Sequence, residues 1–194
     1  MDDIGERILD AAVEAASVHG IGRMSVADVA ARAGLSRPTV YKRYPSKDAL
    51  VAAAVRREAM RVVDATRLAA AGIEDPRDAL TAAVATVLRL AREHPLLDRV
   101  VRTEPERLVP LLTTDDGPIL GAIRPVIEVV VGSRFPTMDT VTCRRVADML
   151  ARLLISYALN APDDPPEVVA RVMAAVLVDG AASLVPGAGC VEAP

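Results

Sequence analysis

Aromatic residues are almost absent from this chain of 194 residues, which contains one Phe, three Tyr and no Trp. Hydrophobic residues still make up 52% of the sequence, so the core must be built from Ala, Val, Leu, Ile and Met. This composition favours helices, because strands are enriched in aromatic and β-branched residues. We find no alternating strand pattern, hairpin signal or internal repeat, and we predict an all-α fold of about nine or ten helices.

Cysteine, histidine and long apolar runs are also scarce. The two cysteines, Cys143 and Cys190, are too few for a disulfide scaffold, and we expect both to be reduced thiols in a cytoplasmic protein. No metal-ligand spacing, nucleophile–histidine–acid set or glycine-rich phosphate loop is present, so we expect no metal, no cofactor and no enzymatic activity. The acidic start, Met1-Asp2-Asp3, is unlike a signal peptide, and no uncharged run is long enough for a membrane span.

Positive charge is concentrated near the N-terminus, although the formal net charge of the whole chain is −3. Residues 20–47 hold six basic residues against one acidic residue, Asp28. The basic residues are Arg23, Arg32, Arg37, Lys42, Arg43 and Lys47. Such a cluster can attract phosphates even on an acidic protein, but on charge alone an ordinary solvated surface is an open alternative.

Glycine, proline and serine divide the chain into amphipathic segments. The periodicity of apolar residues predicts helices over 4–19, 25–33, 36–43, 46–71, 75–94, 96–103, 105–112, 117–134, 138–160 and 165–185. Ser25, Ser36 and Ser46 are expected to cap the second, third and fourth helices, because a serine hydroxyl accepts from N–H groups at a helix start. Gly34 and Gly72 are expected to end the second and the fourth.

The segment 24–50, MSVADVAARAGLSRPTVYKRYPSKDAL, has the pattern of two short helices joined by a tight turn. Such a pair needs a small residue at the helix crossing, a glycine in the left-handed turn and an apolar residue that packs back. Ala30, Gly34 and Val40 meet these needs. We predict a helix-turn-helix whose second helix is cationic on its outer face and suited to the DNA major groove.

These residues resemble the DNA-binding segment of the TetR family of bacterial transcriptional regulators, over roughly residues 5–51. The family pattern has a hydroxyl cap before the second helix, Ala-Gly at the turn and a Ser-x-x-Thr-aliphatic-Tyr recognition helix. An aromatic residue and a Ser-Lys-acidic-x-Leu segment follow. Here the pattern is Ser25, Ala33-Gly34, Ser36 to Tyr41, Tyr44 and Ser46 to Leu50. Tyr44 departs from the more common Phe, and we expect it to be half-buried scaffold.

The resemblance implies which residues meet DNA. Those expected to contact bases, which specify sequence, are Arg37, Pro38 and Thr39. Those expected to contact phosphates, which set the register, are Tyr41, Arg43, Lys47 and, besides its capping role, Ser25. Ser36 and Lys42 complete the predicted DNA-binding set, and Lys42 can meet either a base or the backbone.

The last predicted helix, 165–185, is apolar nearly all round and is therefore expected to be buried on all sides. One side can pack inside the subunit, whereas the other requires a second chain; a monomeric core helix is the alternative. The resemblance implies that the last two long helices pair with their mates in a homodimer. The predicted interface residues are Val146, Leu150, Leu153, Tyr157, Val169, Val172, Val176 and Gly180.

The resemblance also implies a small-molecule pocket in the middle helices, whose occupancy moves the fourth helix. The predicted lining residues are Met60, Val63, Val87, Leu88, His94, Leu97, Val101, Leu108, Leu112, Val126 and Ile127. The scarcity of aromatic residues argues against a planar cation held by ring stacking, so we expect a lipophilic effector. Polar groups that can orient a ligand, although each is more typical of a surface or a cap, are His94, Arg99, Arg102, Glu104 and Glu128.

The predicted organisation is a helix-turn-helix DNA-binding domain over 1–45, a helical effector-binding and dimerisation domain over 46–186 and a flexible tail over 187–194. The predicted function is sequence-specific transcriptional regulation by a repressor that its effector releases from a palindromic double-stranded DNA operator. A helical protein–protein interaction module without DNA binding is the alternative. A salt-dependent gel shift distinguishes the two, because phosphate contacts weaken as salt rises.

Overall fold

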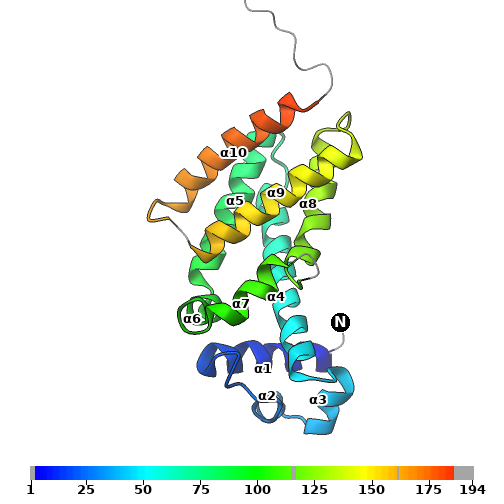
Figure 1. Cartoon of the computed structure of the whole chain (residues 1–194), viewed down its shortest axis with the longest axis vertical. Helices are drawn as coiled ribbons and strands as arrows, with labels where there is room; N and C mark the ends of the chain where they lie inside the picture. The colour runs from blue at the N-terminus through cyan, green and yellow to red at the C-terminus, as the bar shows by residue number, and fades with distance from the viewer. Residues whose placement is uncertain (1–2, 115–116, 161, 186–194) are drawn as a thin grey trace, which may run out of the picture. The chain divides into compact units, whose positions relative to one another are not determined.

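The fold is helical wherever the structure describes the chain. A computed structural model describes residues 3–114, 117–160 and 162–185, without the side chains of Leu108 and Thr113. These residues form ten α-helices and no strand, which confirms the predicted all-α fold (Figure 1). The helices are α1 (Asp3–His19), α2 (Val26–Ala33), α3 (Arg37–Arg43), α4 (Lys47–Ala70), α5 (Pro76–Glu93), α6 (Pro95–Thr103), α7 (Pro105–Thr113), α8 (Leu120–Arg134), α9 (Thr140–Leu159) and α10 (Pro166–Ser183). The predicted tail, 187–194, lies outside the described residues.

The helix boundaries near the N-terminus follow the predicted caps. The Ser36 hydroxyl accepts the Thr39 N–H at 3.3 Å, and the Ser46 hydroxyl accepts the Ala49 N–H at 3.0 Å. Gly34 ends α2 with φ at 65°, a left-handed conformation that glycine adopts without steric strain. Serine and glycine therefore set the limits of α2, α3 and the start of α4.

The chain divides into two compact units whose limits differ from the predicted domain boundary at residue 45. The first unit comprises Met1–Arg61 and Ala91–Gly121, and the second comprises Val62–Leu90 and Ala122–Pro194. The N-terminal part of α4 and the helices α6 and α7 thus belong with the first three helices. The division into a DNA-binding and an effector-binding domain concerns function and stays a prediction.

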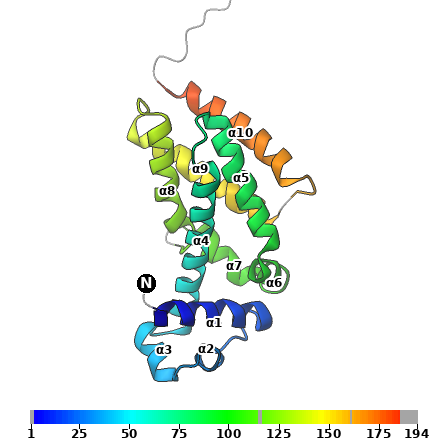
Figure 2. The same ribbon diagram turned by 180° about the vertical axis from the view of Figure 1, so that it is seen from behind.

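The first unit has an aliphatic core that α1 organises. Helix α1 packs against α2 and α6, and α2 packs against α3 (Figures 1 and 2). Ile8 of α1, Val29 of α2, Val40 of α3 and Leu50 of α4 are fully buried. A helix of seven residues such as α3 is not stable alone in water, so the burial of Val40 is needed to hold it.

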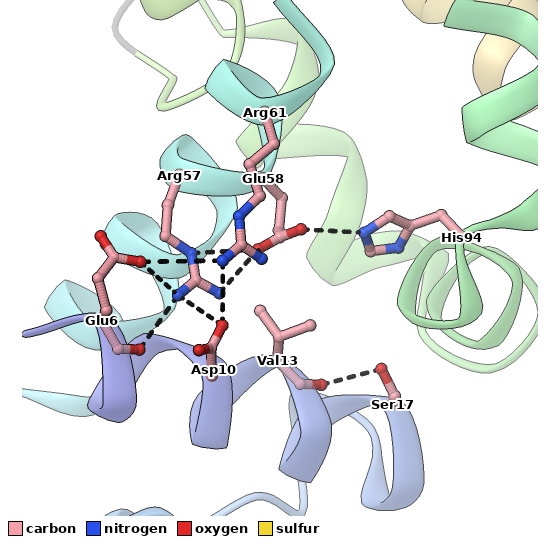
Figure 3. A network of polar contacts seen from close by, with 8 residues as sticks. All are labelled: Glu6, Asp10, Val13, Ser17, Arg57, Glu58, Arg61 and His94. Atoms are coloured by element: carbon pink, nitrogen blue, oxygen red, sulfur yellow. Dashed lines mark hydrogen bonds and ion pairs between the residues drawn. The ribbon is translucent and has the colours of Figure 1, made fainter. Parts of the chain in front are cut away.

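A network of charged side chains joins α1 to α4 in this unit (Figure 3). Arg57 of α4 is its centre: the side chain is only 6% exposed, and its guanidinium lies 3.2 Å from Glu6, 2.9 Å from Asp10 and 2.8 Å from Glu58. Arg61 lies 3.0 Å from Glu58 and 3.2 Å from Asp10. These carboxylates compensate the buried charge of Arg57, which would otherwise destabilise the fold.

The network extends to α6 through His94. Its Nδ1 accepts the Leu97 N–H at 3.3 Å, which caps α6, and its Nε2 lies 3.5 Å from Oε2 of Glu58. Burial by itself would raise the pKa of Glu58, but hydrogen bonds from His94 and Arg57 and the charges of Arg61 and Arg57 outweigh it and lower the pKa to about 2. Glu58 therefore remains an anion at neutral pH and links α4 to α6.

The second unit has two aliphatic clusters built on α10. Val84 and Leu88 of α5 pack against Val169 and Met173 of α10, with Leu154 of α9 beside them. The other cluster joins α8 and α9 to the end of α10 and consists of Val131, Met138, Cys143, Val146 and Ala181. None of the described helices is both long and apolar enough to cross a bilayer.

Cys143 is a free thiol inside this second cluster. Its Sγ donates to the Glu128 carbonyl at 3.3 Å. Burial raises the pKa of the Cys143 thiol, and the charges of Glu128 and Asp139 add to the effect. The thiol is therefore protonated at neutral pH and packs as an apolar residue. Cys190, the other cysteine, lies outside the described residues.

The charge network predicts an unequal response to two neighbouring substitutions. Arg57→Met removes the central cation from three carboxylates, two of which are partly exposed and all of which keep Arg61 nearby. We expect a loss of about 1.5–3 kcal/mol in the free energy of unfolding. Arg56→Met is the matched control, because Arg56 is exposed, and we expect a change within about 0.5 kcal/mol. Urea unfolding measures both, and equal losses would show that the network does not hold the unit together.

Candidate DNA-binding surface

Helices α2 and α3 form the helix-turn-helix predicted from residues 24–50. The Ser25 hydroxyl accepts the Asp28 N–H, while the Asp28 carboxylate accepts from the hydroxyl and the N–H of Ser25. These hydrogen bonds hold the pKa of Asp28 below its usual value. At the other end of α2, Arg7 of α1 donates to the Ala33 carbonyl at 2.6 Å. Both ends of α2 are fixed, which orients the turn into α3.

Helix α3 turns one apolar side chain inward and most of its polar side chains outward. Val40 has no exposed surface, whereas Tyr41 is 48% exposed. The other exposed members of the predicted DNA-binding set on this helix or at its cap are Ser36, Arg37, Pro38, Lys42 and Arg43. Thr39 is half-buried. The structure therefore brings the predicted base-contacting residues together on one short surface that carries three cations.

The hydroxyl groups of the predicted set are already engaged within the protein. Ser36 Oγ and Thr39 Oγ1 lie 2.8 Å apart at the start of α3. The Ser25 hydroxyl donates to the Asp28 carboxylate at 2.6 Å. A phosphate contact by Ser25 thus requires this bond to be exchanged, and the main role of these hydroxyls in the free protein is to define helix starts.

Arg32 and Lys47, which belong to the basic cluster, make contacts inside the first unit. Arg32 of α2 pairs with Glu14 of α1, so its charge is neutralised there. Lys47 donates from Nζ to the Gly22 carbonyl at 2.7 Å, which holds the ammonium beside the loop between α1 and α2. A lysine ammonium has several donors, so this bond leaves capacity for a phosphate. Tyr44 is half-buried, as expected for a scaffold residue.

The predicted dimer residues fall into two groups in the second unit. Those buried in the core of the unit are Val146, Leu150 and Val169. A core side chain has little surface to offer a partner, and the role of these three residues in an interface stays a prediction. Exposed on α9 and α10 are Leu153, Val172, Val176 and Gly180, with Tyr157 half-buried. Within a single chain one side of the last helix is buried and the other is exposed, since Val172 is 62% and Val176 68% exposed. The burial of the exposed side by a second chain stays a prediction.

The predicted pocket residues are divided between the two units. In the first unit are Met60, His94, Leu97, Val101, Leu108 and Leu112, and the side chain of Leu108 lies outside the described part of the chain. In the second unit are Val63, Val87, Leu88, Val126 and Ile127. Leu88 is fully buried in the core of its unit, so its main role is to pack α5 against α10. The lining of an effector pocket stays a prediction.

Four of the five polar groups expected to orient a ligand have partners within the protein. They are His94 with Glu58, Arg102 with Asp98, Glu104 with the Gly22 N–H, and Glu128 with Arg144. Arg99 of α6 differs, because its Nε is buried and has no hydrogen-bond partner. A buried donor without an acceptor destabilises a fold by about 1–3 kcal/mol. No cluster of three or more metal-binding side chains occurs in the described part of the chain.

The long-range contacts of Arg57, Arg7 and Glu104 were not identified from the sequence. Each joins positions far apart in the chain: Arg57 meets Glu6, Arg7 meets Ala33, and Glu104 meets Gly22. No spacing rule pairs such residues. The one local signal was the Gly20-x-Gly22 pattern, which indicates a close backbone approach.

Comparison with protein families matches both parts of this architecture. Residues 8–54 match the model described as bacterial regulatory proteins, tetR family. Residues 75–179, more than half of the chain, match the model described as bacterial tetracyclin repressor, C-terminal domain. The first match covers the helix-turn-helix and the second runs from the start of α5 into α10.

Curated relatives are regulators of the same kind. Over 106 residues the chain is 33% identical to uncharacterised HTH-type transcriptional regulators of Mycobacterium bovis and Mycobacterium tuberculosis. The matched region covers 55% of this chain and 54% of each relative. The chain thus spans about half the length of the curated relatives it matches.

Solved structures share the whole fold at low sequence identity. The TetR family repressor AlkX from Dietzia sp., implicated in biodegradation of n-alkanes, is similar with a TM-score of 0.75 and 24% identity, over 92% of this chain and 98% of that one. The fatty acid degradation regulator FadR from Bacillus halodurans is similar with a TM-score of 0.60 and 18% identity, over 93% and 97% of the two chains. At these identities the likeness shows a common fold.

Proposed function

Because this chain belongs to the TetR family of bacterial transcriptional regulators, we propose that it is a repressor that binds a specific DNA operator and is released by a small molecule. The observation that carries the proposal is the cationic outer face of α3, whose inner residue Val40 is fully buried. The alternative function, a charged protein–protein interaction surface without DNA binding, does not require a helix that is capped at its first turn and follows a glycine turn.

The outer face of α3 has the chemistry for sequence recognition. The major groove of B-DNA is about 12 Å wide and accepts an α-helix. Arg37 stands at the first position of α3, where its guanidinium can donate to O6 and N7 of a guanine. Pro38 can meet a thymine methyl group, and Tyr41 and Arg43 can donate to phosphates. Arg37 is therefore our first candidate for base recognition.

We propose that two chains bind a palindromic operator together. One short helix contacts few bases, and a two-fold dimer doubles the contacts and fixes the spacing of the half-sites. The face exposed on α9 and α10 is apolar, and its members are Met149, Leu153, Val168, Val172 and Val176. Exposed patches of this kind mark interaction sites, and a second copy of the same helices is the partner that TetR family membership supports.

We propose an aliphatic effector with an acidic head group. The few aromatic side chains disfavour ring stacking, which favours an aliphatic ligand. The unpartnered Nε of Arg99 is a donor for a carboxylate. Medium-chain fatty acids are suitable first compounds, because regulators of the same fold are described as acting in n-alkane and fatty acid degradation.

The DNA-binding proposal predicts different effects for two arginine substitutions. We expect the wild type to enrich a palindrome from a randomised duplex pool. Arg37→Ala should weaken binding to that duplex by about 1–3 kcal/mol and relax the preference at one position of each half-site. Arg102→Ala, the control, removes the same charge from an exposed position of α6 and should bind within about twofold of the wild type. An Arg37→Ala protein that keeps the full base preference would show that another residue recognises the sequence.

The dimer proposal predicts that a charge on α10 separates the chains. Val176→Glu places a carboxylate in the proposed interface, where its burial without a partner is unfavourable, and we expect a monomer in analytical ultracentrifugation. Leu68→Glu is the control, because Leu68 of α4 is 78% exposed in the same unit and lies outside the proposed interface. A dimer that survives Val176→Glu but not Leu68→Glu would contradict the assignment.

The effector proposal predicts a response that depends on the head group. Decanoic acid should release the wild type from its operator, and Arg99→Met should lose this response because the carboxylate loses its cation. Decanol, which is neutral, should act equally on both proteins. Fluorescence anisotropy of labelled operator measures the release, with Arg102→Met as a control that keeps Arg99. Equal release of both proteins by decanoic acid would contradict the role of Arg99.

A further inference from the structure

The loop between α1 and α2 closes around the carboxylate of Glu104. Glu104 lies between α6 and α7, and its Oε2 accepts the Gly22 N–H at 2.6 Å. A Cβ atom added at Gly22 would lie 2.9 Å from this oxygen, and one added at Gly20 would overlap Oε1. The absence of side chains at these two positions therefore allows the backbone to approach the carboxylate.

Lys47 also holds the backbone of Gly22, at the carbonyl of the following peptide group. The Gly22 carbonyl accepts from Nζ of Lys47 at 2.7 Å. The Glu104 carboxylate and the Lys47 ammonium thus hold the two peptide groups on either side of the Gly22 Cα, the first through its N–H and the second through its carbonyl. Together these two bonds connect the junction of α6 and α7 to the first residue of α4.

The surroundings of Glu104 favour a role in holding this loop. Its side chain is 15% exposed, and Arg107 is the cation beside it, with Nε 3.4 Å from Oε2. Arg107 is itself 54% exposed, so the pair is partly screened by water. The Gly22 N–H therefore gives the carboxylate its shortest contact, and this contact crosses 82 positions of sequence.

We propose that Glu104 is a positioning residue for DNA binding, which acts through the backbone of Gly22 on Lys47. The inference rests on the proposed function and on the predicted contact of Lys47 with a phosphate. Glu104 itself does not touch DNA; it holds Gly22 so that the carbonyl fixes the Lys47 ammonium at the start of α4.

The test compares substitutions that break the contact with one that retains it. Glu104→Ala removes the acceptor, whereas Glu104→Gln keeps a carbonyl oxygen for the Gly22 N–H and removes only the charge. Asp98→Asn is the matched control, because Asp98 is an exposed acid of α6 whose partner is Arg102. Affinity is measured for the duplex that the wild type enriches from a randomised pool, at several salt concentrations, with thermal unfolding recorded for each protein.

We expect Glu104→Ala to bind the operator about tenfold more weakly, as for loss of one charge-assisted hydrogen bond from the binding-competent state. Glu104→Gln and Asp98→Asn should stay within about threefold of the wild type. Lys47→Ala should weaken binding and lower the slope of log affinity against log salt by about one unit per lost phosphate contact. Because Glu104 acts through Lys47, adding Glu104→Ala to Lys47→Ala should weaken binding by less than about threefold further.

Any one of three results would overturn this inference and leave the proposed function intact. They are operator binding by Glu104→Ala at the wild-type level, a loss of affinity in Glu104→Gln equal to that in Glu104→Ala, or additive losses of affinity in the double variant. Additive losses would mean that Glu104 only stabilises the fold, since a general destabilisation does not depend on Lys47. A wild type that enriches no sequence would instead overturn the proposed function, and this inference with it.

Discussion

The buried guanidinium of Arg57 is the contact on which the arrangement of the first unit depends. The guanidinium is removed from water, and the carboxylates of Glu6 and Asp10 of α1 and of Glu58 of α4 surround it. Loss of one member of such an ion set leaves its partners uncompensated, so the set favours the arrangement in which α1 and α4 lie in contact. Helix α1 in turn fixes the end of α2 through Arg7, so the position of the turn before α3 follows from the same contact.

This dependence explains how a helix of seven residues can present a defined surface. Helix α3 contributes only Val40 to the core, and its own hydrogen bonds are too few for independent stability. Its orientation comes from the capped end of α2, the left-handed Gly34 and the serine cap at Ser36. A surface ordered in advance does not lose conformational entropy on binding, and this favours affinity for a rigid groove.

Local chemistry made much of the fold predictable from the sequence. All ten helices, the caps at Ser25, Ser36 and Ser46 and the turn at Gly34 follow from periodicity and from residues with specific backbone preferences. The exposed face of α3 was also predictable, because Val40 is the apolar residue of this helix that packs into the core. Which residues of α9 and α10 are buried and which are exposed could not be predicted in this way. Val146 and Val176 are equally apolar, and only the packing decides that the first is buried and the second is exposed. Glu6 and Asp10, which pair with Arg57, and Gly22, which donates to Glu104, lie dozens of positions away from them, where no local rule reaches.

Methylation interference on the enriched operator tests most directly whether α3 enters the major groove. Methylation at guanine N7 blocks the major groove, whereas methylation at adenine N3 blocks the minor groove. The account predicts interference by N7-methylguanine at symmetric positions of both half-sites, and no interference by N3-methyladenine at the same base steps. Interference confined to adenine N3, or absent from every guanine, would contradict a recognition helix seated in the major groove.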